Sequence, residues 1–267
     1  MPEQFTPGTI LADMRKSPPL VQCITNYVAM DIAANVLLAA GASPAMVHAE
    51  EEAGEFAALA GALTINIGTI SPAWLRGMMA AAEAISNLGR PWVLDPVAHS
   101  ATALRRRAVG DLMALRPTII RGNASEIMAL GGEHSAGRGV DSGDLVMHAE
   151  DGACRLAIEH EVIVAVTGAV DFVTDGHRAV RISGGSPLMP KVTALGCSLT
   201  ALVGAFAAVT PEHPFDATVA ALASFAVAGE TAGRRAYGPG SFAMHFLDSL
   251  NTLDSAALDA ESKIEQV

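Results

Sequence analysis

Residues 118–130, TIIRGNASEIMAL, contain a short β-strand pattern followed at once by a helix pattern. Thr118 to Ile120 is a run of β-branched residues, which favours a strand. Asn123 to Leu130 opens with a residue that caps helix starts and continues with residues that favour helix. A strand that runs directly into a helix is the repeating unit of a parallel sheet covered by helices. The stretch therefore predicts an α/β fold.

Strand and helix patterns of this kind alternate along most of the chain, so we expect a mostly parallel central sheet flanked by helices. The other predicted strands are Leu20–Thr25, Pro44–His48, Ala62–Ile67, Pro91–Leu94 and Val162–Val166. The other predicted helices are Asp31–Ala40, Glu50–Ala60, 72–87, Thr102–Leu115, Asp144–His160, 196–209, Phe215–Arg235 and Phe242–Leu250. Asp171 to Ile182 is expected to add antiparallel strands around a turn at Asp175-Gly176. We expect one domain over residues 1–267, with a Gly-rich loop at 131–143 and a polar tail after Asp254.

Composition excludes several classes of protein. The chain has 267 residues, of which 51% are hydrophobic and 4% aromatic, and 17 Lys+Arg against 28 Asp+Glu give a net charge of −11. This length and apolar content suffice for a core without disulfides. Lysine occurs only at positions 16, 191 and 263, so there is no basic stripe for a phosphate backbone. We therefore expect no nucleic-acid partner.

The cysteines and the termini bear on location. Cys23, Cys154 and Cys197 are odd in number and widely spaced, which argues against a disulfide framework or a zinc site and favours the cytoplasm. The first residues lack the basic and apolar regions of a secretory signal. The uncharged run from Val192 to Thr210 is rich in Gly, Ala, Ser and Thr, which insert poorly into lipid. We expect no membrane partner.

Polar residues follow or end most of the predicted strands. Because the carboxyl ends of parallel strands share one edge, where open α/β sheets bind their ligands, these residues predict a single site. Ordinary loop polarity is the alternative reading. The residues are Asn26, Asn66, Asp95, Arg121, Asn123 and Thr167.

A phosphate would have to be bound here without a Walker A lysine, because no G-x-x-x-x-G-K-[ST] occurs. The segment 192–197 leads from an extended run into a helix, which places free backbone N–H groups around Gly196. The start of a helix lowers the pKa of a thiol in this first turn, which makes Cys197 a candidate proton acceptor. The phosphates of a bound ATP would raise the same pKa, so the sequence leaves the net direction open, and we expect some titration near neutrality. Buried packing is the alternative role for Cys197.

Asn123 and Glu126 stand three residues apart at the start of the short helix. This spacing is typical of a capping box, and it is equally consistent with organising Mg²⁺. Asp95, between a buried strand and Pro96, is a second acid that could complete a water-rich Mg²⁺ site.

Eight stretches, taken in order, carry a resemblance to a known family. They are 22–26 (QCITN), 41–46 (GASPAM), 66–69 (NIGT), 95–97 (DPV), 121–126 (RGNASE), 166–168 (VTG) with Asp171, 196–197 (GC) and 238–241 (GPGS). Together they resemble hydroxyethylthiazole kinases, thiamine-salvage enzymes of the ribokinase-like superfamily, over nearly the whole chain. The resemblance implies a ribokinase-like three-layer fold, and a homotrimer with sites at subunit boundaries.

The resemblance also implies roles for individual residues. Met46 and Ala194 would contact the thiazole, and Arg121 and Thr167 would bind ATP. Cys197 stands where most ribokinase-like enzymes have an aspartate as general base. Asn123 with Glu126 resembles the N-x-x-E element that organises Mg²⁺ and phosphate, and we add Asn26 to the predicted substrate residues and Gly196 to the ATP residues because of their places at the sheet edge and helix start.

The chain departs from the family at two places. Ala98-His99-Ser100 follows Asp95-Pro96-Val97 where the family usually has glycines, and Ala194 opens the anion loop in place of a glycine. Alanine tolerates a positive φ poorly. Either the phosphate loops are reshaped here, or these positions never needed a positive φ.

The function favoured by this reading is phosphoryl transfer from ATP and Mg²⁺ to the primary alcohol of 4-methyl-5-(2-hydroxyethyl)thiazole. One alternative is a ribokinase-like kinase of another heteroaromatic alcohol, such as a hydroxymethylpyrimidine. Another is a sensor that binds a nucleotide or metabolite without turnover.

Overall fold

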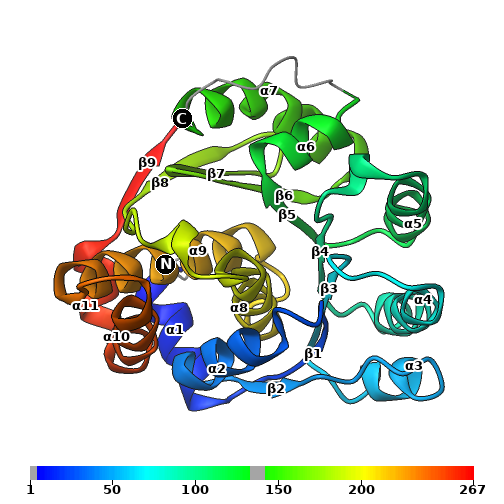
Figure 1. The fold of residues 1–267 in the computed structure, drawn as a ribbon, viewed down its shortest axis with the longest axis horizontal. Helices are drawn as coiled ribbons and strands as arrows, with labels where there is room; N and C mark the ends of the chain where they lie inside the picture. The colour runs from blue at the N-terminus through cyan, green and yellow to red at the C-terminus, as the bar shows by residue number, and fades with distance from the viewer. Residues whose placement is uncertain (1–4, 133–141) are drawn as a thin grey trace.

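A computed structural model describes residues 5–132 and 142–267 and contains one nine-stranded sheet (Figure 1). The strands lie side by side in the order β2-β1-β3-β4-β5-β6-β7-β8-β9. Their bounds are β1 Leu20–Ile24, β2 Ser43–Ala45, β3 Ala62–Asn66, β4 Trp92–Asp95, β5 Ile119–Asn123, β6 Ile163–Thr167, β7 Val170–Thr174, β8 Ala179–Ser183 and β9 Lys263–Gln266. Strands β1 to β6 pair in parallel. Strands β6 to β9 pair antiparallel, so the predicted mostly parallel sheet with an antiparallel addition is confirmed.

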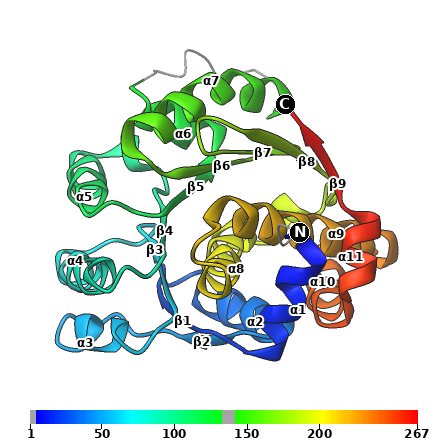
Figure 2. The same ribbon diagram turned by 180° about the vertical axis from the view of Figure 1, so that it is seen from behind.

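Helices cover both faces of the sheet (Figure 2). One face carries α1 Pro7–Lys16, α2 Met30–Ala40, α8 Leu195–Val209, α9 Pro214–Arg235, α10 Pro239–Thr252 and α11 Ser255–Glu261. The other carries α3 Ala53–Ala57, α4 Pro72–Asn87, α5 Ala103–Met113, α6 Ala124–Leu130 and α7 Ser142–His160. Two short 3₁₀ helices, η1 His99–Ala101 and η2 Met189–Lys191, lie in loops. The three-layer α/β architecture is confirmed.

Helix α8 lies at the centre of the larger apolar core. Almost every residue from Leu195 to Ala207 is buried, and the helix packs against α2, α9 and the sheet. A helix that is apolar all round belongs inside a protein or a membrane. In the described part of the chain no helix has the length and apolarity needed to cross a bilayer. The uncharged run at 192–210 is therefore a core segment.

Local capping residues set the ends of several helices. The Ser71 side chain accepts from Trp74 N at 3.2 Å and Pro72 is the first residue of α4. Gly41 ends α2 in the left-handed conformation, with φ 107°. Ser71 supplies the oxygen that caps a helix start, Pro72 the fixed φ that suits the first helical residue, and Gly41 the positive φ that ends a helix.

The predicted polar tail after Asp254 is wrong. Asp254 caps α11, accepting from Ala257 N at 2.8 Å, and Leu258 is fully buried. Strand β9 then pairs with β8 at the edge of the sheet. Lys263–Gln266 is polar because an edge strand keeps one side in solvent, so its composition did not indicate a strand.

Other departures are smaller. Helix α1 was not predicted, although the Thr6 side chain caps it by accepting from Thr9 N at 3.2 Å. The predicted helix 50–60 is only Ala53–Ala57, and the predicted strand 44–48 is Ser43–Ala45. Most of the predicted Gly-rich loop 131–143 lies outside the described residues. The single domain over residues 1–267 stays a prediction.

Candidate active site

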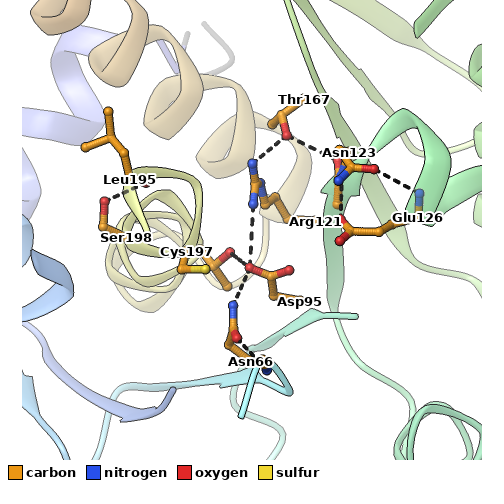
Figure 3. Close-up of polar contacts among 12 residues, drawn as sticks. Asn66, Asp95, Arg121, Asn123, Glu126, Thr167, Leu195, Cys197 and Ser198 are labelled. Atoms are coloured by element: carbon orange, nitrogen blue, oxygen red, sulfur yellow. Dashed lines mark hydrogen bonds and ion pairs between the residues drawn. The ribbon is translucent and has the colours of Figure 1, made fainter. Parts of the chain in front are cut away.

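The polar residues predicted at the strand ends lie together at one edge of the sheet (Figure 3). Asn66 and Asp95 are the last residues of β3 and β4 and face each other in register. Asn123 and Thr167 hold the same relation at the ends of β5 and β6. The parallel register thus gathers side chains that are far apart in the sequence.

Asp95 is the most connected of these side chains. It is fully buried, and its Oδ2 accepts from Asn66 Nδ2 and from Thr200 Oγ1, each at 2.7 Å. Arg121 Nη1 lies 3.5 Å from the same oxygen. Oδ1 has no hydrogen-bond partner. Asp95 therefore joins β3, β5 and α8, and keeps one carboxylate oxygen available.

Burial, with a smaller contribution from nearby Glu126, raises the pKa of Asp95 to about 6, while Arg121 and the hydrogen bonds from Thr200 and Asn66 lower it. Burial disfavours the charged form of a carboxyl group. The charge of Asp95 is thus maintained at neutral pH at a cost to stability.

Cys197 lies in the first turn of α8, with its sulfur 3.5 Å from Asn26 Nδ2. Burial raises the pKa of this thiol and Asp95 raises it further, while Arg121 and the amides of Asn26 and Asn66 lower it. The net direction is upward, so titration near neutrality is wrong for the protein without nucleotide. Desolvation and a neighbouring carboxylate outweigh the effects of Arg121 and the two amides.

Arg121 connects Asp95 to the helix start. It donates to Thr167 Oγ1, and its Nε is buried without a partner. A Cβ at Gly196 would lie 3.1 Å from Arg121 Nη2, so glycine lets the guanidinium approach the first turn of α8. A guanidinium with a spare donor beside free backbone N–H groups is suited to an anion.

A cavity of about 730 Å³ opens beside this anion site. Its lining includes all four predicted ATP residues, Arg121, Asn123, Thr167 and Gly196. The volume lies within the range of small-molecule sites. Sequence reasoning missed the part of the wall that comes from the 184–190 loop and from α9, including Met189 and Phe225.

Glu126 forms the predicted capping box. Its Oε2 accepts from Asn123 N at 2.9 Å, and Asn123 Oδ1 accepts from Glu126 N at 3.0 Å. Glu126 Oε1 also accepts from Ala98 N at 3.0 Å. Each carboxylate oxygen accepts one N–H and keeps further lone pairs, so capping leaves Glu126 able to contact a cation or its water.

Both departures from the family glycines adopt the left-handed conformation, Ala98 with φ 50° and Ala194 with φ 57°. These two positions therefore do require a positive φ, and the loops keep that geometry with alanine. For a non-glycine residue this conformation costs roughly 1–2 kcal/mol. The surrounding contacts, such as the bond from Ala98 N to Glu126, offset the strain.

The predicted substrate residues are less closely gathered. Asn26 lies against Cys197, but its oxygen already accepts from Val28 N and Ala29 N. Met46 follows β2 and packs, partly buried, against the core that contains α8. Thr200 was missed as a site residue. It lies one turn after Gly196 on α8, and that spacing could have indicated it.

Comparison with known proteins identifies close relatives. A model of the hydroxyethylthiazole kinase family matches residues 11–256. A hydroxyethylthiazole kinase from Rhizobium rhizogenes strain K84 is 70% identical over 259 residues, which cover 97% of each chain.

Solved structures agree with this match. The structure of a hydroxyethylthiazole kinase protein from Pyrococcus horikoshii OT3 has a TM-score of 0.90 and 40% identity, and the match covers 98% of each chain. A pyridoxal kinase from Staphylococcus aureus in complex with AMP-PCP and pyridoxal has a TM-score of 0.62 at 14% identity, covering 94% of this chain and 100% of that one. The second likeness shows the fold alone, and the ribokinase-like fold is confirmed.

The raised pKa of Asp95 predicts a pH-dependent cost in stability. The folded protein binds this proton more tightly than the unfolded chain, where the pKa is about 3.9. As pH rises from about 4 to 6, the free energy of unfolding should therefore fall relative to that of Asp95→Asn, by on the order of 2 kcal/mol. Urea unfolding of both proteins, with a chelator present, measures this difference in the free energy of unfolding. A difference between the two proteins that stays constant over this range would contradict the prediction.

The left-handed Ala194 predicts an unusual response to glycine. Ala194→Gly should leave the free energy of unfolding unchanged or raise it by up to about 1 kcal/mol, because relief of the positive φ offsets the greater freedom of the unfolded chain. The control Ala84→Gly, inside α4, should lower it by about 1 kcal/mol. Equal losses at both positions, measured by urea unfolding, would show that Ala194 carries no strain.

Proposed function

The chain belongs to the hydroxyethylthiazole kinase family, and we propose that it transfers a phosphoryl group from ATP to the primary alcohol of 4-methyl-5-(2-hydroxyethyl)thiazole, in thiamine salvage. The observation that carries this proposal is the position of the cavity. The four residues expected to bind ATP line it, and Gly196, at its wall, directly precedes Cys197. Phosphoryl donor and proton acceptor would thus meet at the first turn of α8.

ATP would enter the cavity with its phosphates toward the start of α8. The free backbone N–H groups of the first turn and the unpartnered Nε of Arg121 supply donors for the phosphate oxygens. Thr167 and Asp95 hold the guanidinium from two sides, so that it is oriented before the nucleotide binds. Asn123 would contact the nucleotide from the end of β5.

Glu126 and Asp95 would hold Mg²⁺. The buried, unpartnered Oδ1 of Asp95 and the spare lone pairs of Glu126 are oxygen donors suited to this ion. Within residues 5–132 and 142–267 no cluster of three possible ligands occurs, which fits an ion that keeps most of its waters and phosphate ligands. When bound, Mg²⁺ would neutralise charge on the phosphates.

Cys197 would act as the general base. As the alcohol oxygen forms its bond to phosphorus and the bond to ADP breaks, the sulfur of Cys197 takes the hydroxyl proton. A loose transition state needs only modest help of this kind, so most of the rate would come from positioning and charge stabilisation. Met46 and Ala194 would contact the thiazole, with Asn26 beside them.

The test is incubation of the protein with ATP, Mg²⁺ and a panel of thiazole and pyrimidine alcohols, with mass detection of the phosphorylated product. We expect phosphorylation of the thiazole alcohol. A pyrimidine product in its place would favour the other heteroaromatic kinase. Nucleotide binding with no alcohol-dependent ADP formation would favour a sensor and refute the proposal.

We further propose a homotrimer with sites at subunit boundaries, in the cytoplasm. Tyr27 and Val28, directly after Asn26, expose 69% and 56% of their surface. Apolar side chains exposed beside a site are suited to cover by another subunit. Val28→Asp should convert a trimeric mass in light scattering into a monomeric one and abolish activity, whereas Leu59→Asp, at a leucine that is even more exposed than Val28, should change neither. A fully active wild-type monomer at micromolar concentration would contradict this.

Glu126→Gln should reduce kcat by about 10²- to 10³-fold at saturating Mg²⁺, because it removes a charge near the transferring phosphate. Ser125→Ala is the matched control, since Ser125 donates to the cap oxygen of Asn123 at 2.7 Å and carries no charge. Steady-state kinetics should show this control within about threefold of wild type. A loss below threefold for Glu126→Gln would leave it only a capping role.

Cys197→Ala should lose about 10- to 10³-fold in kcat, and Cys197→Asp should be faster than Cys197→Ala. Burial would raise the pKa of an aspartate at this position as it raises that of the Cys197 thiol, but the aspartate starts from a reference pKa of about 3.9 and so is ionised at pH 7 to a far greater extent. The wild-type rate should therefore rise above pH 7 as thiolate forms, and the Asp variant should not. Equal impairment of both variants, with folding and ATP binding intact, would mean that Cys197 only packs the loop.

A further inference from the structure

A chain of hydrogen bonds connects the buried carboxylate of Asp95 to the sulfur of Cys197. Asn66 Nδ2 donates to Asp95 Oδ2 at 2.7 Å, and Asn26 Nδ2 donates to Asn66 Oδ1 at 2.8 Å. Asn26 Nδ2 also lies 3.5 Å from Cys197 Sγ. Figure 3 shows Asn66, Asp95 and Cys197 close together. Asn66 and Asp95 are the last residues of β3 and β4, and Asn26 follows the end of β1.

The orientation of the Asn26 amide is determined by backbone donors. Its Oδ1 accepts from Val28 N and from Ala29 N, each at 3.0 Å. A backbone N–H can only donate, so reversing the amide would turn its NH₂ group toward two other donors. The NH₂ group of Asn26 must therefore face Asn66 and Cys197.

The orientation of Asn66 is determined at both ends. Its Oδ1 accepts from Gly68 N at 3.0 Å and from Asn26, and its NH₂ group faces the carboxylate of Asp95, which accepts when ionised. Asn26, Asn66 and Asp95 are all buried, so water does not readily replace a lost partner. Donation therefore runs outward from the Asn26 amide, to the Cys197 sulfur on one side and through Asn66 to Asp95 on the other.

Close packing fixes the amides in position. A Cβ at Gly68 would lie 2.8 Å from Asn26 Nδ2 and 2.9 Å from Asn26 Cβ. Glycine at this position therefore allows the β3 loop to pack directly against Asn26.

We propose that Asn66 is a positioning residue, which holds the Asn26 amide as a hydrogen-bond donor to the Cys197 sulfur and so favours the thiolate form. The inference rests on the proposed role of Cys197 as proton acceptor. A donor that is fixed in direction stabilises the charged form of the group it faces and disfavours the neutral one. In this way the site partly offsets the effect of burial on a thiol that must accept a proton.

The charged groups around Cys197 are consistent with this role. Asp95 on β4 raises the pKa of the thiol, as burial does, while Arg121 on β5 and the two amides lower it. The same carboxylate that opposes the thiolate through its charge thus anchors the amide chain that stabilises the thiolate. Thr200 donates to the same Asp95 oxygen as Asn66 but is not a member of the amide chain that leads to Asn26, which makes it a matched control.

The experiment measures alkylation of Cys197 by iodoacetamide as a function of pH, in the full chain without nucleotide and with a chelator. Mass spectrometry of the Cys197 peptide separates it from Cys23 and Cys154. Asn26→Ala should raise the midpoint of the alkylation profile by about one pH unit, and Asn66→Ala should raise it by at least about half a unit. Thr200→Val should leave the midpoint within about 0.2 units.

Kinetics supply a second measurement. Asn66→Ala should lower kcat more than it changes KM for the alcohol, and should move the rising limb of the kcat profile to higher pH. An unchanged alkylation midpoint in Asn66→Ala, or an equal shift in Thr200→Val, would overturn the inference. If Asn66→Ala does not fold, as judged by circular dichroism, the alkylation midpoint of Asn26→Ala is used instead. An unchanged midpoint in Asn26→Ala would overturn the inference as well.

Failure of this inference and failure of the proposed function are distinguishable. Alkylation needs no turnover, so a protein without kinase activity would still report the midpoints. An active kinase with unshifted midpoints in both asparagine variants would overturn the role of Asn66 alone.

Discussion

The buried carboxylate of Asp95 is the contact that holds the site together. It takes hydrogen bonds from Asn66 on β3 and Thr200 on α8 and faces Arg121 on β5. A charge removed from water is costly unless it is paired and hydrogen-bonded, and these three partners meet that requirement. The sheet edge and the start of α8 are thereby joined at one point. The raised pKa of about 6 shows that the compensation is incomplete, as is common where function competes with stability.

The backbone is strained in the two loops of the site that contain Ala98 and Ala194. Ala98 and Ala194 both have a positive φ, one beside Glu126 and the other at the start of α8. Such strain persists only where the surroundings determine the conformation. Helix α8 provides this at Ala194, because nearly all of its residues are buried and cannot shift without disrupting the core. The loop geometry is thus set by the packing behind it.

Two site residues show where local reading of the sequence succeeds and where it fails. The N-x-x-E spacing of Asn123 and Glu126 left a capping box and a magnesium site as alternatives, and the structure shows that the capping bonds leave lone pairs free for a cation. For Cys197 the sequence left the net direction of the pKa shift open. Burial and Asp95 raise the pKa, and neither can be seen in the residues next to Cys197.

The sequence by itself determined the alternation of strands and helices, the capped start of α4 at Ser71 and the end of α2 at Gly41, because those signals act within a few residues. It also indicated which polar residues share the sheet edge. Only the tertiary structure decided the role of α11 and β9, whose polar residues are held by a distant partner strand and a buried Leu258. It alone decided the far wall of the cavity and the pairing of Asn26 with Asn66 and Cys197. These depend on contacts between segments 40 or more residues apart, which no local pattern encodes.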